Sequence, residues 1–224
     1  VGMNLPNLKC EIHELDMYPE ESDVYVSNFF YMGTNEKLFL KGLMNMRLLC
    51  IHPGLLDPTY TGNSMKIDTL IGDIKTHPSE KTIVFCQFHK EMDIISNHLV
   101  QNNYTVIRLD GTIPTENRDR IVKKFKESYR ASGKPFDAEC PAPVFIIQIK
   151  TGGQGLNLQE ATRVYIMSPS WNPATEIQAI SRAHRTGQRH DVFVKKYVYK
   201  SPDGANSIDE IIVKLHKEKS MICA

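Results

Sequence analysis

The sequence lacks paired cysteines, a long apolar run and an excess of charge of either sign. Its five cysteines stand singly at 10, 50, 86, 140 and 223, so neither a zinc site nor a disulfide framework is indicated, and a reducing compartment is the better match. No apolar run approaches the ~18 residues of a membrane helix, and the first residues show no signal-peptide pattern. Because 27 Lys and Arg nearly balance 26 Asp and Glu, any nucleic-acid binding must depend on local groups rather than on bulk charge.

What is present is an ordinary globular composition. The 224 residues include 41% hydrophobic and 24% charged side chains, which suits one domain, or one and a half, with a sizeable core. A start at Val1 instead of Met suggests that the chain is part of something longer. Residues 1–34 are polar and show no clear periodicity, so we expect an irregular lead-in there.

Helical and strand patterns alternate along the rest of the chain. Short β-branched segments without polar alternation predict strands that are buried on both faces, and segments with apolar residues at helical spacing separate them. The predicted helices are 35–52, 65–76, 90–101, 115–130, 173–185 and 207–219, and the predicted strands are 82–88, 104–109, 144–149, 163–168 and 192–199. This order predicts an α/β fold, with a mostly parallel sheet sandwiched between helices.

A glycine-rich segment follows the predicted strand 144–149. It reads Lys150-Thr-Gly-Gly-Gln-Gly-Leu-Asn-Leu158, with three glycines in four positions. Glycines let backbone N–H groups approach an anion closely, and ligands of parallel α/β sheets lie beyond the carboxyl ends of the strands. A plain structural turn is the alternative. The segment is not a Walker A loop, because the pattern GxxxxGK[ST] occurs nowhere in the chain.

The predicted helix 173–185 carries two arginines and a glutamine on one side. At about 100° per residue, Gln178, Arg182 and Arg185 fall within one narrow sector. The opposite side holds Ile177, Ala179, Ile180 and Ala183. We therefore expect an apolar stripe to dock the helix on the sheet while the polar side chains project together. A solvated basic face is the alternative.

A third polar segment ends the predicted strand 104–109. Asp110-Gly111-Thr112 lies where a strand end would meet a ligand, although a tight turn alone explains an Asp-Gly pair. The helix that follows carries the cations Arg118, Arg120, Lys123, Lys124 and Lys126. Such a charge cluster is usually just solvated.

Read together, these segments resemble the second RecA-like lobe of superfamily II helicase-like ATPases, specifically of the Swi/Snf family of DNA translocases. The resemblance covers roughly residues 36–220 in blocks that occur in the right order. These blocks are Arg47–Pro53 at the helix end before the lobe, Thr82–His89 as motif IV, Leu109–Thr112 with Glu116–Arg120 and Phe125, Lys150–Leu158 as motif V, Ser170–Pro173 as the Trp-Asn-Pro element, Gln178–Gln188 as motif VI, and Ser207–Lys219 as a bracing helix.

The resemblance implies roles for individual residues. Arg182 and Arg185 look like arginine fingers that reach the ATP phosphates, which suits charge developing on a transferring phosphoryl group. Gln178 and Gly155 are implied to contribute to the nucleotide site, and Gln178 also to couple it to DNA. The implied contacts to the DNA backbone come from Asp110, Gly111, Thr112, Lys150, Gly152, Gly153, Asn157 and Trp171. For Trp171, a core aromatic that covers the sheet edge is the alternative.

The sequence departs from the family pattern in three places. Gln148 and Thr151 stand where the family usually has Ser or Thr and a small Ala or Ser, which puts the polar contacts of motif V in doubt. The connection 131–143, with three prolines, is predicted to be an exposed loop and is longer than is usual between these blocks. Residues 1–34 match nothing in the pattern.

The resemblance also defines the expected organisation. We expect residues 1–60 to form a lead-in tail and the helix between lobes, 61–200 the RecA-like lobe, and 201–224 a bracing helix. The chain lacks a Walker A lysine and a Walker B acidic pair, so ATP and Mg²⁺ would be held mainly by an N-terminal RecA-like lobe of the same parent chain. Alone, this chain is therefore predicted to neither hydrolyse ATP nor translocate.

The expected partners are double-stranded DNA and the N-terminal lobe, with no membrane and no protein-bound metal. The expected location is a nucleus, or a cytoplasmic replication site if the parent is viral. Two alternatives stay open: a non-catalytic module that binds DNA or protein, and a strand-separating helicase on RNA or single strands. The Trp-Asn-Pro element and the Ala-His-Arg-Thr-Gly-Gln form of motif VI argue against the second alternative. The oligomeric state and the biological task are not indicated.

Overall fold

The computed structural model describes residues 4–29, 35–151 and 155–222. Its elements follow the chain as β1 (Leu8–Leu15), α1 (Pro19–Phe29), α2 (Glu36–Leu49), the 3₁₀ turn η1 (Pro53–Leu55), α3 (Met65–Thr76), β2 (Thr82–Cys86), α4 (His89–Gln101), β3 (Val106–Leu109), α5 (Thr115–Lys126), β4 (Val144–Gln148), β5 (Arg163–Ile166), α6 (Pro173–Ile180), β6 (Val192–Tyr199) and α7 (Ile208–Ile222). No described helix is long and apolar enough to cross a membrane.

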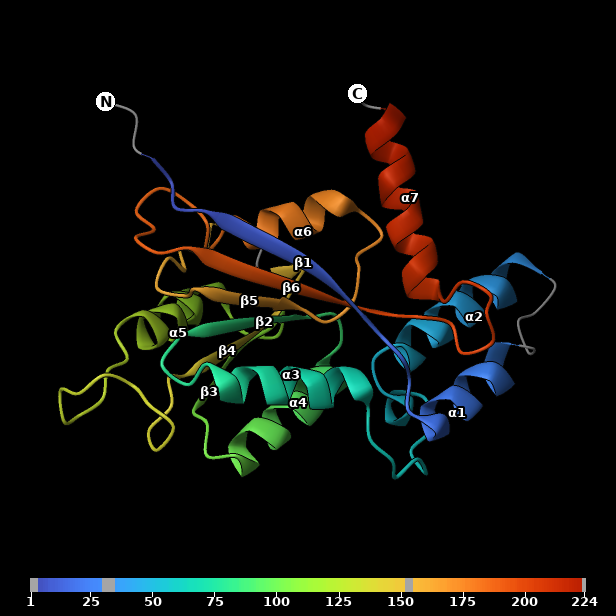
Figure 1. Ribbon diagram of the computed structural model, residues 1–224, viewed down its shortest axis with the longest axis horizontal. Helices are drawn as coiled ribbons and strands as arrows, with labels where there is room; N and C mark the ends of the chain where they lie inside the picture. The colour runs from blue at the N-terminus through green and yellow to red at the C-terminus, as the bar shows by residue number, and fades with distance from the viewer. Residues whose placement is uncertain (1–3, 30–34, 152–154, 223–224) are drawn as a thin grey trace.

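The strands form one parallel sheet in the order β1-β6-β5-β2-β4-β3. The predicted fold class is confirmed. Helices α3 and α4 cover one face, and α5 and α6 cover the other (Figure 1). Because both faces are covered, every residue of β2 and β5 is buried, which is why these strands show no polar alternation.

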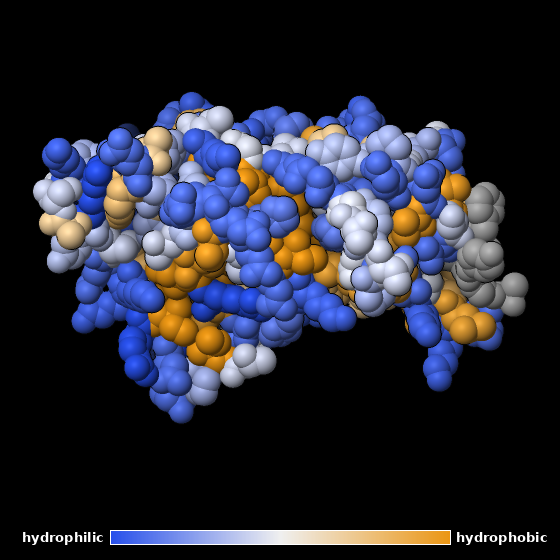
Figure 2. All heavy atoms as spheres, turned by 90° about the horizontal axis from the view of Figure 1, so that it is seen from below, coloured by the Kyte–Doolittle hydropathy of each residue, from blue (hydrophilic) through white to orange (hydrophobic). Residues whose placement is uncertain are grey.

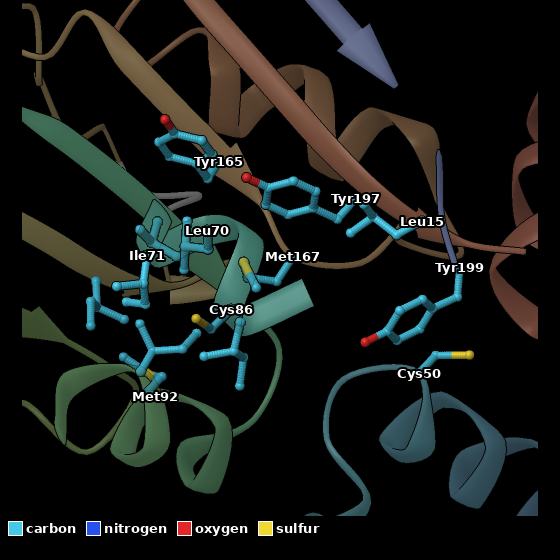
Figure 3. Close-up of a cluster of buried hydrophobic side chains, with 14 of the residues drawn as sticks. Leu15, Cys50, Leu70, Ile71, Cys86, Met92, Tyr165, Met167, Tyr197 and Tyr199 are labelled. Carbon is cyan, nitrogen blue, oxygen red and sulfur yellow. The ribbon is translucent and has the colours of Figure 1, made fainter. Parts of the chain in front are cut away.

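The two faces of the sheet carry separate apolar clusters. On the α3 and α4 side, Tyr165, Met167 and Tyr197 project from the strand region toward Leu70 and Met92 of the helices (Figure 3). The other cluster packs the residues of α5 and α6 against the opposite side chains of the same strands. Seen from below, apolar atoms also reach the surface as a patch between hydrophilic flanks (Figure 2).

The expectation that residues 1–34 are irregular is wrong for the part of them that the structure describes. Residues Leu8–Leu15 form β1, an edge strand that pairs in parallel with β6, and Pro19–Phe29 form α1. The strand was missed because seven of its eight residues are not fully buried, so it carries polar side chains, and because its partner lies more than 180 residues away in the sequence. No local pattern reports such a pairing.

A buried polar cluster, the α7 anchor, joins α3, β6 and α7. Lys66 Nζ lies 2.6 Å from Asp209 Oδ2 and 3.1 Å from Ser168 Oγ, and Lys66 is fully buried. The amide of Tyr199 donates to the same carboxylate of Asp209 at 3.0 Å. The Tyr199 hydroxyl donates to Glu21 of α1 at 2.8 Å. The anchor therefore ties the first and last helical segments to the sheet.

Candidate functional site

The turn after β3 and the start of the glycine-rich segment meet at the carboxyl ends of β2, β3 and β4. Gln148 joins them. Its amide Nε2 donates to the carbonyl of Gln87 at 3.3 Å, and its Oε1 accepts from the Gly111 amide at 3.0 Å and from Thr151 Oγ1 at 3.4 Å. The side chain that departs from the family pattern thus holds the ends of three strands together. In the sequence, the feature that could have indicated this role of Gln148 is its position at the end of an apolar strand.

The Asp110 turn is stabilised by its own hydrogen bonds. Asp110 Oδ1 accepts from the amide of Thr112 at 2.9 Å and from its hydroxyl at 2.5 Å. The other oxygen lies 3.6 Å from His89 Nδ1 and 3.6 Å from Arg108 Nε. Burial opposes ionisation of Asp110, but these hydrogen bonds and nearby positive groups outweigh it, so the pKa of Asp110 is lowered. The carboxylate shapes the turn, and Gly111 and Thr112 are its exposed residues.

Only part of the glycine-rich segment lies within the described residues. Gly152 and Gly153, both predicted DNA contacts, lie outside them. Lys150 is exposed directly after β4, whereas Thr151 is buried. Gly155 has a φ of +67°, a backbone conformation that favours glycine, and open space surrounds the position of a Cβ. Asn157 Oδ1 is buried and accepts no hydrogen bond from the described part of the chain.

The predicted helix 173–185 is shorter than expected. It ends at Ile180, with Ser181 as its C-cap, so Arg182 and Arg185 lie on the turns that follow it. The expectation of one helical sector for Gln178 and both arginines is therefore wrong. Two features explain the early end: the Arg182 carbonyl accepts from the Leu158 amide at 2.9 Å, and Gln188 bonds this segment to a neighbouring loop. Tertiary hydrogen bonds thus occupy the carbonyls of Arg182 and Ala183, while the amides of Ala183 and His184 still bond to the Ile180 carbonyl.

The apolar stripe of this helix is only partly confirmed. Ala179 and Ala183 are buried in the core and Ile180 packs against it, but Ile177 is 67% exposed. Gln178 is exposed, while Arg182 and Arg185 are half-buried.

The arginine segment and the end of the glycine-rich segment form one hydrogen-bonded unit. Gln188 Nε2 donates to the carbonyls of Gln159 at 2.9 Å, Ala161 at 3.1 Å and Ala183 at 3.0 Å. Gln159 in turn donates from its side-chain amide to the carbonyl of Thr186. Neither glutamine was singled out from the sequence. Together with the bond from the Leu158 amide to the Arg182 carbonyl, their bonds hold the arginine segment against residues 158–161.

Trp171 lies on the surface. It is 42% exposed, and the guanidinium of Arg47 sits 5.6 Å from its ring centre, so the alternative of a core aromatic is not supported. Its neighbour Ser170 is held in place, because Glu176 accepts from the Ser170 amide at 2.8 Å and pairs with Lys196 at 2.7 Å. The ring is thus presented from a rigid turn beside the strand ends.

A hollow of about 810 Å³ lies at the amino ends of β2, β5 and β6, and residues such as Lys81, Thr162 and Phe193 line it. Within the described ranges, no group of His, Cys, Asp and Glu has the arrangement of a metal site.

The chain is similar to known proteins both in sequence and in fold. Residues 65–187 match the family model described as "Helicase conserved C-terminal domain". The chain is 34% identical over 175 residues to "DNA repair protein RAD5" of Debaryomyces hansenii, which covers 75% of this chain and 13% of that protein. It is 28% identical over 170 residues to "DNA repair and recombination protein RAD54-like" of Drosophila willistoni, which covers 76% and 20%. The chain thus spans a fifth or less of these relatives.

Two solved structures share the fold. The C-terminal part of the Fun30 ATPase domain superposes with a TM-score of 0.73 at 23% identity, over 96% of this chain and 90% of that one. The SWI2/SNF2 ATPase core of Sulfolobus solfataricus, solved in complex with dsDNA, superposes with a TM-score of 0.69 at 24% identity, over 87% and 41%. At these identities the likeness establishes the architecture alone.

Proposed function

The chain belongs to the helicase conserved C-terminal domain family and is homologous to RAD5- and SNF2-type ATPases; from this we propose that it is the second RecA-like lobe of an ATP-dependent translocase on duplex DNA. The observation that carries the proposal is the hydrogen-bonded unit formed by the arginine segment and the end of the glycine-rich segment. It holds two guanidinium groups beside a backbone segment suited to phosphates.

In this proposal Arg182 and Arg185 are catalytic. They face the cleft between two lobes and stabilise the charge that develops on the transferring γ-phosphoryl group of ATP. Gln178 and Gly155 contribute to the nucleotide side of the cleft. ATP and Mg²⁺ are held mainly by the N-terminal lobe, because this chain has no phosphate-binding lysine loop of its own.

The DNA-contacting residues of the proposal lie on the neighbouring turns. The phosphate contacts come from the exposed Gly111, Thr112 and Lys150, with Asn157 and Trp171 beside them. Gly152 and Gly153 keep the role that the family resemblance implies. Asp110 acts indirectly, since its carboxylate is engaged in shaping the turn that presents Thr112. Closure and opening of the two lobes would advance these contacts along the duplex.

The arginine assignment is tested in the two-lobed parent with Arg185→Ala. Losing such a finger typically costs on the order of 10³-fold in turnover, while duplex binding should persist because the DNA-contacting turns are unchanged. The matched control is Arg189→Ala, an exposed arginine that follows Gln188 and lines the hollow at the amino ends of β2, β5 and β6. Unchanged ATP turnover in Arg185→Ala, or an equal loss in Arg189→Ala, would show that the finger is wrongly assigned.

Two further measurements separate the alternatives. Phosphate release by this chain alone, at the level of a blank, is expected of a lone lobe, and turnover above the blank would contradict the proposal. Stimulation of the parent's ATPase by duplex DNA rather than by single-stranded DNA or RNA is expected of a translocase. The reverse order would favour a strand-separating helicase, and a parent without ATPase would favour a binding module. The names of the RAD5 relatives support a nuclear location.

A further inference from the structure

The first strand of the sheet, β1, is a free edge. Among the described residues it stands at one end of the strand order and pairs with β6 alone, over eight residue pairs (Figure 1). The opposite edge strand, β3, has only four residues. An edge strand presents a row of unpaired N–H and C=O groups, which is a ready template for a further strand. β1 is the longer of the two templates.

The direction of the backbone bonds identifies which groups of β1 are free. The Val192 amide donates to the carbonyl of Asn7 at 3.0 Å, and the Lys200 amide donates to that of Leu15 at 2.9 Å. Odd-numbered residues therefore direct their backbone groups toward β6. Because successive residues of a strand point these groups to opposite sides, the even-numbered residues from Leu8 to Glu14 direct theirs outward.

On the outward side, the residue before β1 is Pro6, which is bonded elsewhere, so the unpaired backbone groups begin within the strand. Just before the strand, the carbonyl of Pro6 lies 2.8 Å from the ring Nε2 of His184, and Pro6 has no N–H. Next to the free edge, the side chains of Leu8 and Ile12 are 40% and 45% exposed, and Cys10 between them is exposed as well. These three residues share one side of the strand, since alternate side chains of a strand point to the same face.

We propose that β1 binds the β1 of a second copy of this chain as an antiparallel pair, about a two-fold axis at Cys10. In this register Leu8 faces Ile12 and Lys9 faces Glu11, and symmetry makes each pair occur twice. The Lys9 ammonium also lies 3.6 Å from Asp191 Oδ2, but its side chain is 56% exposed and can meet both carboxylates. Apolar pairs and opposite charges directly across an antiparallel ladder stabilise it. A strand that complements itself in this way forms an isologous interface, in which both copies use the same surface.

Neighbouring registers are poorer. An axis at Glu11 would place that carboxylate opposite its own copy, and like charges directly opposite are destabilising. An axis at Ile12 would place Cys10 opposite Glu14 and the apolar Leu8 opposite Asp16. The Cys10 register alone among these three combines apolar pairs with opposite charges. This self-complementarity is what points to a second copy rather than to an unrelated strand.

Cysteine cross-linking tests the register directly. Directly opposed residues of a hydrogen-bonded antiparallel pair have Cα atoms about 5.5 Å apart, so a short bis-maleimide should join Cys10 to Cys10 of the other copy. Burial raises the pKa of the Cys10 thiol, so the reaction is run at mildly alkaline pH. The background variant carries Cys140→Ser and Cys223→Ser, so that these thiols do not react. Cys50 and Cys86 are left unchanged because they are buried. Cys10→Ser in this background is the control that should give no product.

Charge variants test the pairing without a cross-link. Glu11→Lys should raise the dimer dissociation constant roughly tenfold, because two opposite-charge pairs become like-charge pairs, and Lys9→Glu should do the same. Mixing these two variants should restore association as a heterodimer, and the double variant Lys9→Glu/Glu11→Lys should restore it within one chain. The matched control is Glu14→Lys, an exposed position of the same strand that faces Pro6 in this register.

Sedimentation over a range of concentrations gives the dissociation constants, and circular dichroism verifies that each variant folds. Restoration by the mixed and double variants supports the interface. The proposal is overturned by a chain that stays monomeric with no Cys10-dependent product, by an equal effect of Glu14→Lys, or by folded charge variants that associate like the parent. None of these outcomes depends on the proposed function, because no measurement involves DNA or ATP.

Discussion

Polar side chains stabilise two regions of the molecule: the strand ends, where Gln148 bonds to Gln87, Gly111 and Thr151, and the α7 anchor. The two regions differ in burial and in charge. At the strand ends, the half-exposed Gln148 bonds mainly to backbone groups of neighbouring turns. In the anchor, the buried Lys66 and Asp209 form an ion pair at 2.6 Å with no access to water. Buried charges are costly to leave unpaired, whereas neutral hydrogen bonds contribute modestly. The anchor therefore governs stability, and the strand ends govern the geometry of the site.

Breaking the anchor should have the largest effect. Lys66→Met would leave the Asp209 carboxylate buried without its cation, which typically lowers the free energy of unfolding by ~3–5 kcal/mol. Urea unfolding followed by circular dichroism measures this change. Lys75→Met, an exposed lysine on the same helix, is the control and should have little effect. Restoration of most of the stability is expected for Lys66→Met/Asp209→Leu, and a single variant as stable as the parent would refute the role of the anchor.

A carboxyl group between the two regions should make stability depend on pH. Glu91, at the start of α4, is fully buried, and burial raises its pKa to about 7 despite the hydrogen bonds it accepts from the amides of Phe88 and Gln87. Because the folded chain holds this proton more tightly than the unfolded chain, the free energy of unfolding should fall as the pH rises from about 4.5 to about 7, by roughly 3 kcal/mol.

Glu91→Gln isolates this contribution. The amide does not titrate, so the difference in unfolding free energy between parent and variant should change across that pH window and stay constant above it. Glu116→Gln, an exposed glutamate in the first turn of α5, serves as the control. A difference that does not vary between pH 4.5 and 7 would mean that Glu91 ionises normally.

Removing the link between the strand ends should affect stability least. Gln148→Ala deletes three hydrogen bonds, two of them to backbone groups, and a neutral hydrogen bond contributes ~1 kcal/mol at most sites. We expect a loss of about 1–2 kcal/mol, faster hydrogen exchange at the Gly111 amide and a severalfold weaker affinity for duplex DNA. Gln101→Ala at the exposed end of α4 is the control. Unchanged exchange at Gly111 would show that Gln148 does not position this turn.

The sequence predicted most elements of the core and the segments of the site. Buried strands such as β2 and β4 were recognisable because parallel sheets covered on both faces need continuous apolar runs. The polar segments after β3 and β4 were recognisable because strand ends are where ligands of such sheets lie. These are local patterns, and local patterns can be read without knowing the partner of each segment.

The errors occurred where distant segments decide the structure. The sequence pattern of β1 does not indicate a strand, because its neighbour β6 in the described sheet comes near the other end of the chain. The predicted helix 173–185 is longer than α6, because the hydrogen bonds from Leu158 and Gln188 that end it come from outside the helix. Gln148 was regarded as a departure from the family, while in the fold it connects three strand ends.

By itself, the sequence determined the α/β architecture, the order of the motifs and the absence of a phosphate-binding lysine loop, because periodicity and spacing act over a few residues at a time. Tertiary structure alone decided which glutamines hold the strand ends, how far the arginine helix extends and which strand is left at the edge. Each of these features depends on a hydrogen bond between residues that are tens of positions apart in the sequence. Only the fold brings such residues close together in space.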